Sequence, residues 1–204
     1  MTTLSLDAVQ RVQERIARAH ALANERFREA FASGTGPLPP KAHMAMQAKA
    51  LVECASGLRV NGEIRYDVID DESTPYIEGA ERGKPVYEAF DVDRNPEAIF
   101  EYWLVISDIV GATSWRMTRL VATAGDYDAA LMRMQSPQIV RALVITHLPS
   151  VDARDDGTAL LEATVYTRAE EERIERRQLL LDVHNEFHYH GRALLAEGRG
   201  GVRI

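Results

Sequence analysis

The hydrophobic pattern of this chain changes its period near Gly57, and that change limits what each part can form. Before Gly57, apolar residues recur every three or four positions, which is the spacing of one face of an α-helix. After it, apolar and polar residues alternate through Leu58–Val68, which is the pattern of a half-buried β-strand. Helices followed by strands predict an α+β fold rather than an alternating α/β fold.

Two helices are expected before Gly57. The first begins after Ser5, which can cap it, and ends at the glycines and prolines of residues 34–40. The second is expected over Lys41–Ala55, with Gly57 just beyond its end. The first helix either packs on its own chain or pairs with a second copy, because both arrangements need the same apolar stripe.

Several strands are expected after Gly57, joined by turns. Asn61-Gly62 is expected to form either a hairpin turn or a bulge, and the acidic segment 70–83 a surface loop. A short helix capped by Asp126 is expected over Tyr127–Gln135. The other predicted strands are Pro85–Val92, Ala98–Asp108, Ser114–Ala122, Ile139–His147, Thr158–Arg168, Arg173–Val183 and Glu186–Leu195.

The segment Ala98–Asp108 has two interpretations. Asn95-Pro96-Glu97 before it is a good helix start, with proline at the first helical position. Its Ile, Phe, Tyr, Trp and Val residues instead favour a strand. We prefer the strand because these residue types crowd the whole segment.

Together these elements predict one α+β domain over residues 1–204. Its parts are a helical region 1–57, mainly strands over 58–197 and a flexible tail 198–204. The two N-terminal helices are expected to pack on a curved, mainly antiparallel sheet, an arrangement that commonly leaves a pocket. The NTF2-like and START-like folds have this architecture. They are analogies of architecture only, because no motif here identifies either family.

Composition and missing motifs exclude several classes of function. The 24 Lys and Arg residues against 31 Asp and Glu give a net charge of −7, which argues against binding nucleic acid or a membrane surface. The single cysteine, Cys54, excludes an intramolecular disulfide and a zinc ribbon. The charged N-terminal stretch has no signal-peptide core, so a cytoplasmic location is expected. No phosphate-binding, dinucleotide or serine-hydrolase motif is present, and no cofactor is predicted.

The most unusual local feature is a group of three histidines within residues 184–190. On a strand, one face would carry His184, Glu186, His188 and His190, in line with Asp182. The other face, expected to be core, would carry Val183, Phe187 and Tyr189. On a helix, His184 and His188 would instead form an i,i+4 pair. We prefer the strand because alternation accounts for more of the residues.

Three roles for the histidine group remain open at this point. The histidines form a solvated strand face, line a pocket as acid–base or ligand-binding groups, or bind a transition metal. We predict a protein that binds a small molecule and acts as a cofactor-free acid–base enzyme of the isomerase, lyase or hydrolase kind. His188 and His190 are the predicted acid–base groups, supported by His184 and Glu186, and no metal ligand is assigned.

Two other functions are kept as alternatives. The first is a non-catalytic interaction or adaptor protein that forms a homo-oligomer through its long first helix and exposed sheet. The second is a protein that binds a transition metal through the histidines of residues 184–190. A homo-oligomer is expected, and the pocket interpretation adds a small-molecule ligand. Nucleic acid and membranes are not expected as partners.

Overall fold

The computed structural model describes residues 1–33, 42–69, 72–77, 85–111, 117–141, 148–168 and 171–199. Its contacts divide the chain into two compact units. We name them the sheet unit, Met1–Val9 with Ser114–Ile204, and the helical unit, Gln10–Thr113. Helix α1, Leu6–Ala32, is continuous from the first unit into the second. That the chain forms one domain stays a prediction, because this division does not show whether either unit folds alone.

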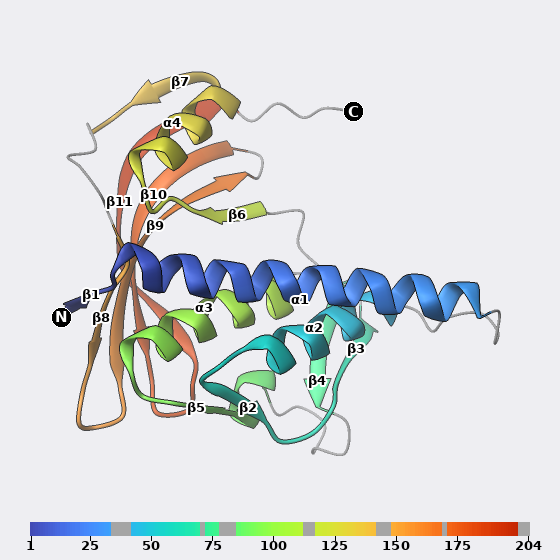
Figure 1. Cartoon of the computed structure of the whole chain (residues 1–204). Helices are drawn as coiled ribbons and strands as arrows, with labels where there is room; N and C mark the ends of the chain where they lie inside the picture. Colours follow the sequence, from blue (N-terminus) through green and yellow to red (C-terminus); the bar gives the residue numbers. More distant parts are fainter. Residues whose placement is uncertain are drawn as a thin grey trace. The chain divides into compact units, whose positions relative to one another are not determined.

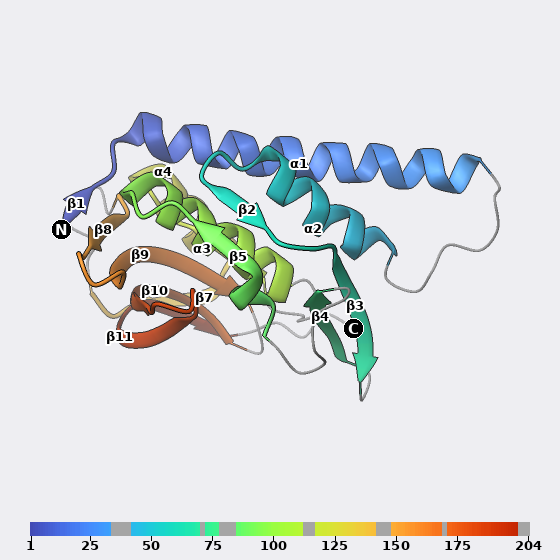
Figure 2. The ribbon, with the colours of Figure 1, turned by 90° about the horizontal axis from the view of Figure 1, so that it is seen from below.

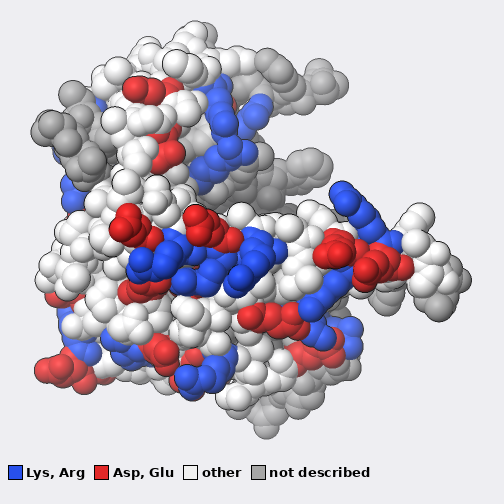
Figure 3. Space-filling view, viewed as in Figure 1, with Lys and Arg blue, Asp and Glu red and all other residues white. Residues whose placement is uncertain are grey.

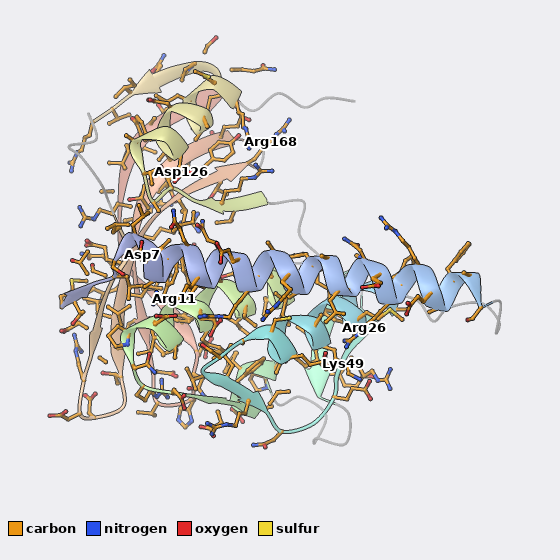
Figure 4. All side chains as sticks on the ribbon, in the orientation of Figure 1. Asp7, Arg11, Arg26, Lys49, Asp126 and Arg168 are labelled. Atoms are coloured by element: carbon orange, nitrogen blue, oxygen red, sulfur yellow. The ribbon has the colours of Figure 1, made fainter. Side chains whose placement is uncertain are left out.

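The helical unit confirms both helices that were expected before Gly57. Helix α1 extends to Ala32, and α2 covers Ala42–Cys54. The two helices lie side by side in Figure 2. An ion pair of 2.8 Å between Arg26 Nη2 and Glu53 Oε2 links them, and Figure 4 labels Arg26 on α1.

The segment predicted as a strand at Ala98–Asp108 is a helix, and that prediction was wrong. Helix α3 covers Pro96–Gly111. Asn95 caps it, because its Oδ1 accepts a 2.9 Å hydrogen bond from the Ala98 amide. Most α3 side chains are buried, and a helix that is buried on most sides shows only a weak one-sided stripe in its sequence. The local start signal therefore outweighed the β-propensity of the apolar residues.

The helical unit also holds two small antiparallel pairs of strands. Its strands are β2 (Leu58–Val60), β3 (Ile64–Ile69), β4 (Glu72–Ile77) and β5 (Phe90–Val92), with a short 3₁₀ helix, η1, at Val86–Ala89. Strand β2 pairs with β5, and β3 pairs with β4. Asn61-Gly62 is therefore neither a hairpin turn nor a bulge, because it joins strands of different sheets. The predicted surface loop 70–83 is wrong for residues 72–77, which form β4, and its other residues lie outside the described ranges.

Gly57 packs closely against Ala98, near the start of α3. A Cβ atom at this position would lie 2.4 Å from the Ala98 Cβ, which is far inside van der Waals contact. The backbone amide of Asp93 also donates to the Gly57 carbonyl at 3.0 Å, which fixes this segment. Only glycine fits here without moving the backbone.

We therefore expect Gly57→Ala to destabilise the protein by about 1–3 kcal/mol, the usual cost of overpacking. Gly125→Ala in α4 is the matched control, since its Cβ would lie 3.7 Å from the nearest atom, Thr123 Oγ1. Alanine there favours the helix by up to about 1 kcal/mol. Urea unfolding followed by circular dichroism measures both. Equal stability of the two variants would contradict the close packing at Gly57.

Polar side chains of α1 contact α3 at several points along their length. The carboxylate of Glu101 is fully buried, and it accepts from Arg15 Nε at 2.5 Å and from the Ser56 amide at 3.0 Å. Glu97 accepts from Arg11 at 2.8 Å. In Figure 3, Lys and Arg side chains form a continuous patch over the first half of α1, and Asp and Glu side chains lie beside it and gather over the second half.

His20 of α1 and Asp108 of α3 form a further contact, with Nε2 and Oδ2 2.9 Å apart. The hydrogen bond to Asp108 raises the pKa of His20 above its ordinary value, although partial burial opposes the shift. The folded protein therefore holds the proton more tightly than the unfolded chain. This contribution to stability is complete below the unfolded pKa and is lost as the pH rises through the folded pKa.

Replacing His20 by Gln should accordingly cost more stability at about pH 5.5 than at about pH 8.5. Both side chains are about two fifths exposed, so the difference should stay below about 1 kcal/mol. Chemical unfolding of wild type and variant at both pH values tests this expectation. A cost that is the same at both values, or larger at the higher one, would contradict the His20–Asp108 pairing.

The sheet unit is built on one seven-stranded antiparallel sheet, which confirms the predicted α+β class and sheet type. Its strands are β1 (Thr2–Thr3), β6 (Met117–Leu120), β7 (Gln135–Ile139), β8 (Ser150–Ala153), β9 (Ala159–Arg168), β10 (Glu171–Leu181) and β11 (Phe187–Arg199). Their order is β1-β8-β9-β10-β11-β7, and β6 also pairs with β9. Strands β9, β10 and β11 curl strongly (Figures 1 and 2).

Helix α4, Ala124–Arg133, packs on one end of this sheet. Thr123 is its N-cap, and Asp126 completes a capping box as the third helical residue (Figure 4). The prediction that Asp126 itself caps the helix was thus wrong by three residues. The core at this end consists of Val121, Tyr127, Ala130, Met134, Tyr166, Ile174, Leu195 and Ala196.

Two boundaries predicted for the last third of the chain need correction. A strand was predicted to begin at Ile139 and run to His147. Strand β7 instead covers Gln135–Ile139 and so ends where the predicted strand begins. Residues 142–147 lie outside the described ranges. The predicted tail at 198–204 begins too early, because β11 continues to Arg199. Among the helices that the structure describes, none is long and apolar enough to cross a membrane.

Candidate functional site

The predicted histidine group lies at the turn between β10 and β11. Strand β11 includes His188 and His190, so the helical interpretation was wrong. The turn itself holds His184 and Glu186. It is closed by the Asp182 amide, which donates to the Glu186 carbonyl at 3.0 Å. Asn185 has φ of 66°, a left-handed conformation that asparagine tolerates better than most residues.

The Asp182 carboxylate organises this turn. Its Oδ1 accepts hydrogen bonds from the amides of His184 at 2.8 Å and Glu186 at 2.9 Å. Its Oδ2 lies 3.0 Å from His188 Nε2. One oxygen thus shapes the backbone while the other faces an imidazole, which is a common use of aspartate at turns.

Glu186 completes a group of three side chains. Its Oε2 lies 3.8 Å from His188 Nε2, and one ligand atom from each of Asp182, Glu186 and His188 lies within 4.8 Å of the others. Partial burial would raise the pKa of Asp182, but hydrogen bonds from His188 and two backbone amides outweigh it and lower that pKa. The hydrogen bond to Asp182 raises the pKa of His188, so this pair favours the charged form of both groups.

His190 lies apart from this group because the pairing of β10 and β11 is irregular beside it. Leu179 pairs with Tyr189, whereas Gln178 pairs with Gly191, which leaves His190 as the extra residue of a β-bulge. The alternation that predicted a shared face for His188 and His190 stops at this point. Of the four predicted site residues, the described part of the chain brings together His188 and Glu186, joined by Asp182.

The opposite face of this segment is not core, contrary to the prediction. Val183 is 55% exposed and Tyr189 is 68% exposed, and Phe187 is only partly buried. The guanidinium carbon of Arg177 lies 5.7 Å from the centre of the Tyr189 ring. Both faces of the strand end therefore contact solvent, and the hairpin end is exposed.

A different polar feature, which the sequence did not indicate, lies beside α4. Thr164 is fully buried and Tyr127 is 8% exposed, yet neither hydroxyl oxygen has a hydrogen-bond partner among the described residues. Nearby Tyr166 shows the usual arrangement, since its hydroxyl donates to Glu172 Oε1 at 2.9 Å. An unpaired hydroxyl is a property of the packed structure, and no spacing of residue types could have identified it.

Both unpaired hydroxyls belong to the same side of the sheet. Thr164 and Tyr166 are two residues apart on β9, so their side chains project from one face. Tyr166 and Tyr127 belong to the same core group, which places α4 on that face. Arg168, labelled in Figure 4 at the end of β9, is two residues beyond Tyr166 on the same strand. Its Nε lies 3.6 Å from Glu172 Oε1.

Polar side chains continue along this face from Thr164 toward the hairpin. Glu162 forms an ion pair with Arg176 and accepts from Gln178 Nε2 at 2.8 Å. Gly191 leaves room for that amide, because a Cβ there would lie 2.9 Å from Gln178 Oε1. Leu180 lies two residues beyond Gln178 on β10, and it pairs with His188 of β11.

Comparisons with known protein families, curated proteins and solved structures found no match for this chain. The geometry of the two features described above is therefore the basis for any functional conclusion.

Proposed function

We propose that the protein binds a small, largely apolar molecule in the sheet unit, through the hydroxyls of Thr164 and Tyr127. The observation that carries this proposal is that both hydroxyls are buried without a partner. An unsatisfied buried polar group costs about 1–3 kcal/mol, and native structures contain few of them. A polar atom of a bound molecule would supply the missing partner.

The surroundings of Tyr127 indicate the class of molecule. Val121, Ile174 and Leu195 belong to the same core group, so the body of the ligand would contact apolar side chains. Burial, followed by the charge of Asp128, raises the pKa of Tyr127 above its ordinary value. Its hydroxyl therefore stays protonated and can donate to a neutral oxygen, such as the carbonyl or hydroxyl of an uncharged ligand.

Acid–base catalysis by His188, His190, His184 and Glu186 stays a prediction. These side chains belong to the exposed end of the β10–β11 hairpin, whereas the unpaired hydroxyls are buried. A hydroxyl pair is suited to holding a ligand and has no group that titrates near neutral pH. Binding is therefore the function that we propose.

Removal of the two hydroxyls should leave the fold intact and abolish binding. Thr164→Val and Tyr127→Phe each remove an unpaired polar atom, so stability should be unchanged or higher by up to about 1 kcal/mol. Tyr166→Phe is the matched control, because it breaks a bond to buried Glu172 and should cost about 1–3 kcal/mol. Chemical unfolding compares the three variants.

Binding is measured on the same proteins. Native mass spectrometry of gently purified wild type should show an added organic mass, and Nile red, an uncharged apolar dye, should bind saturably. Both signals should fall in Thr164→Val and Tyr127→Phe and remain in a variant at exposed His184. A wild-type protein with neither signal would contradict the proposal. Loss of stability in the two hydroxyl variants equal to that of Tyr166→Phe would also contradict it.

A further inference from the structure

The hairpin between β10 and β11 groups three side chains of types that bind metal ions. We propose that Asp182, Glu186 and His188 together bind one divalent transition-metal ion, with Zn²⁺ as the representative ion. The three ligand atoms, two carboxylate oxygens and one imidazole nitrogen, lie within 4.8 Å of one another. None of the three residues belongs to the hydroxyl pair proposed to hold a small molecule in the sheet unit.

His188 Nε2 and Asp182 Oδ2 lie at the spacing of two ligands on one metal ion, and Glu186 Oε2 lies somewhat farther away. Zinc lies about 2.1 Å from nitrogen and oxygen ligands, which places neighbouring ligand atoms about 3.0–3.4 Å apart in octahedral or tetrahedral geometry. His188 Nε2 lies 3.0 Å from Asp182 Oδ2 and 3.8 Å from Glu186 Oε2. The first distance already fits, and a small rotation of the Glu186 side chain brings the second into range.

The backbone holds two of the ligands in place before any ion binds. Asp182 Oδ1 is fixed by the amides of His184 and Glu186, which leaves Oδ2 directed toward His188. His188 belongs to the β11 strand and pairs with Leu180 across the ladder. Because the turn and the ladder fix these positions, little conformational freedom is lost when an ion binds.

The ligand set selects the class of ion. An imidazole with two carboxylates suits zinc, manganese, iron or nickel, whereas calcium and magnesium take oxygen ligands almost exclusively. Two carboxylates balance the charge of a divalent ion. The side chains of Asp182, Glu186 and His188 are 27%, 40% and 46% exposed, which leaves space for water to complete the coordination.

The two neighbouring histidines provide internal controls. His184 lies in the same turn and His190 is the bulged residue of β11, and neither belongs to the group of three. General affinity of a histidine-rich segment would depend on all three imidazoles alike. A defined site depends on His188 alone among them.

The test is isothermal titration of Zn²⁺ into untagged, chelator-treated full-length protein. We expect one ion per chain, and at least tenfold weaker binding in His188→Ala and in Glu186→Gln, because loss of outer-shell partners alone costs 10–100-fold. His184→Ala and His190→Ala should bind within about twofold of wild type. Asp182 is left unchanged because its Oδ1 shapes the turn, and circular dichroism checks that each variant is folded.

X-ray absorption spectroscopy of the zinc-loaded protein gives a second readout. One imidazole per zinc, with the remaining ligands oxygen, is the expected result. Two or more imidazoles per zinc, equal weakening by all three histidine variants, or binding weaker than about 1 mM would overturn the proposal. None of these results depends on whether a small molecule binds beside α4, so the two proposals succeed or fail separately.

Discussion

The register of β10 against its two neighbours determines which side chains can act together in the sheet unit. Strand β10 pairs with β9 without interruption, whereas its pairing with β11 shifts at two places. The regular pairing of β10 with β9 keeps Thr164 and Tyr166 on one face of the sheet, the face on which α4 packs. One shift in the pairing of β10 with β11 separates His190 from His188. The other allows two consecutive residues, Leu195 and Ala196, both to enter the core. Bulges commonly redirect side chains in this way.

The buried carboxylates of Glu172 and Glu101 are well partnered, in contrast to the unpaired hydroxyls of Thr164 and Tyr127. Glu172 accepts from the Tyr166 hydroxyl and from the Gln135 amide, at 2.9 and 3.1 Å. Glu101, fully buried in the helical unit, accepts from Arg15 and from the segment after α2. Among the described residues, four buried side-chain atoms have no partner: the hydroxyls of Thr164 and Tyr127, and the guanidinium nitrogens Arg26 Nη1 and Arg173 Nε. A bound molecule would supply a partner to the two hydroxyls.

The long periodic elements could be predicted from the sequence, and the reason is physical. Helix α1 buries one face, and β9 and β10 alternate between buried and partly exposed residues over part of their length, so their apolar residues repeat at the period of the structure. Helix α3 was missed because it is buried nearly all round, although Asn95 and Pro96 marked its start. Propensity alone could not separate a buried helix from a buried strand.

The candidate sites were predicted only in part. The sequence indicated the right hairpin and two of the three grouped side chains, His188 and Glu186, and it placed Asp182 in the same row. The sequence could not indicate the bulge at His190. A bulge changes which residues of β10 and β11 face each other, and it leaves no mark in the residue types of β11 itself. The unpaired hydroxyls depend on contacts between α4 and the sheet, which no local pattern encodes.

The bulge in β11 decides which histidine joins Asp182 and Glu186. Cross-strand nuclear Overhauser effects in isotope-labelled protein test it most directly. The account predicts contacts of Leu180 with His188 and of Gln178 with Gly191. Contacts of Gln178 with His190 in place of Gly191 would show a regular ladder, with both histidines on one face, and would contradict the account.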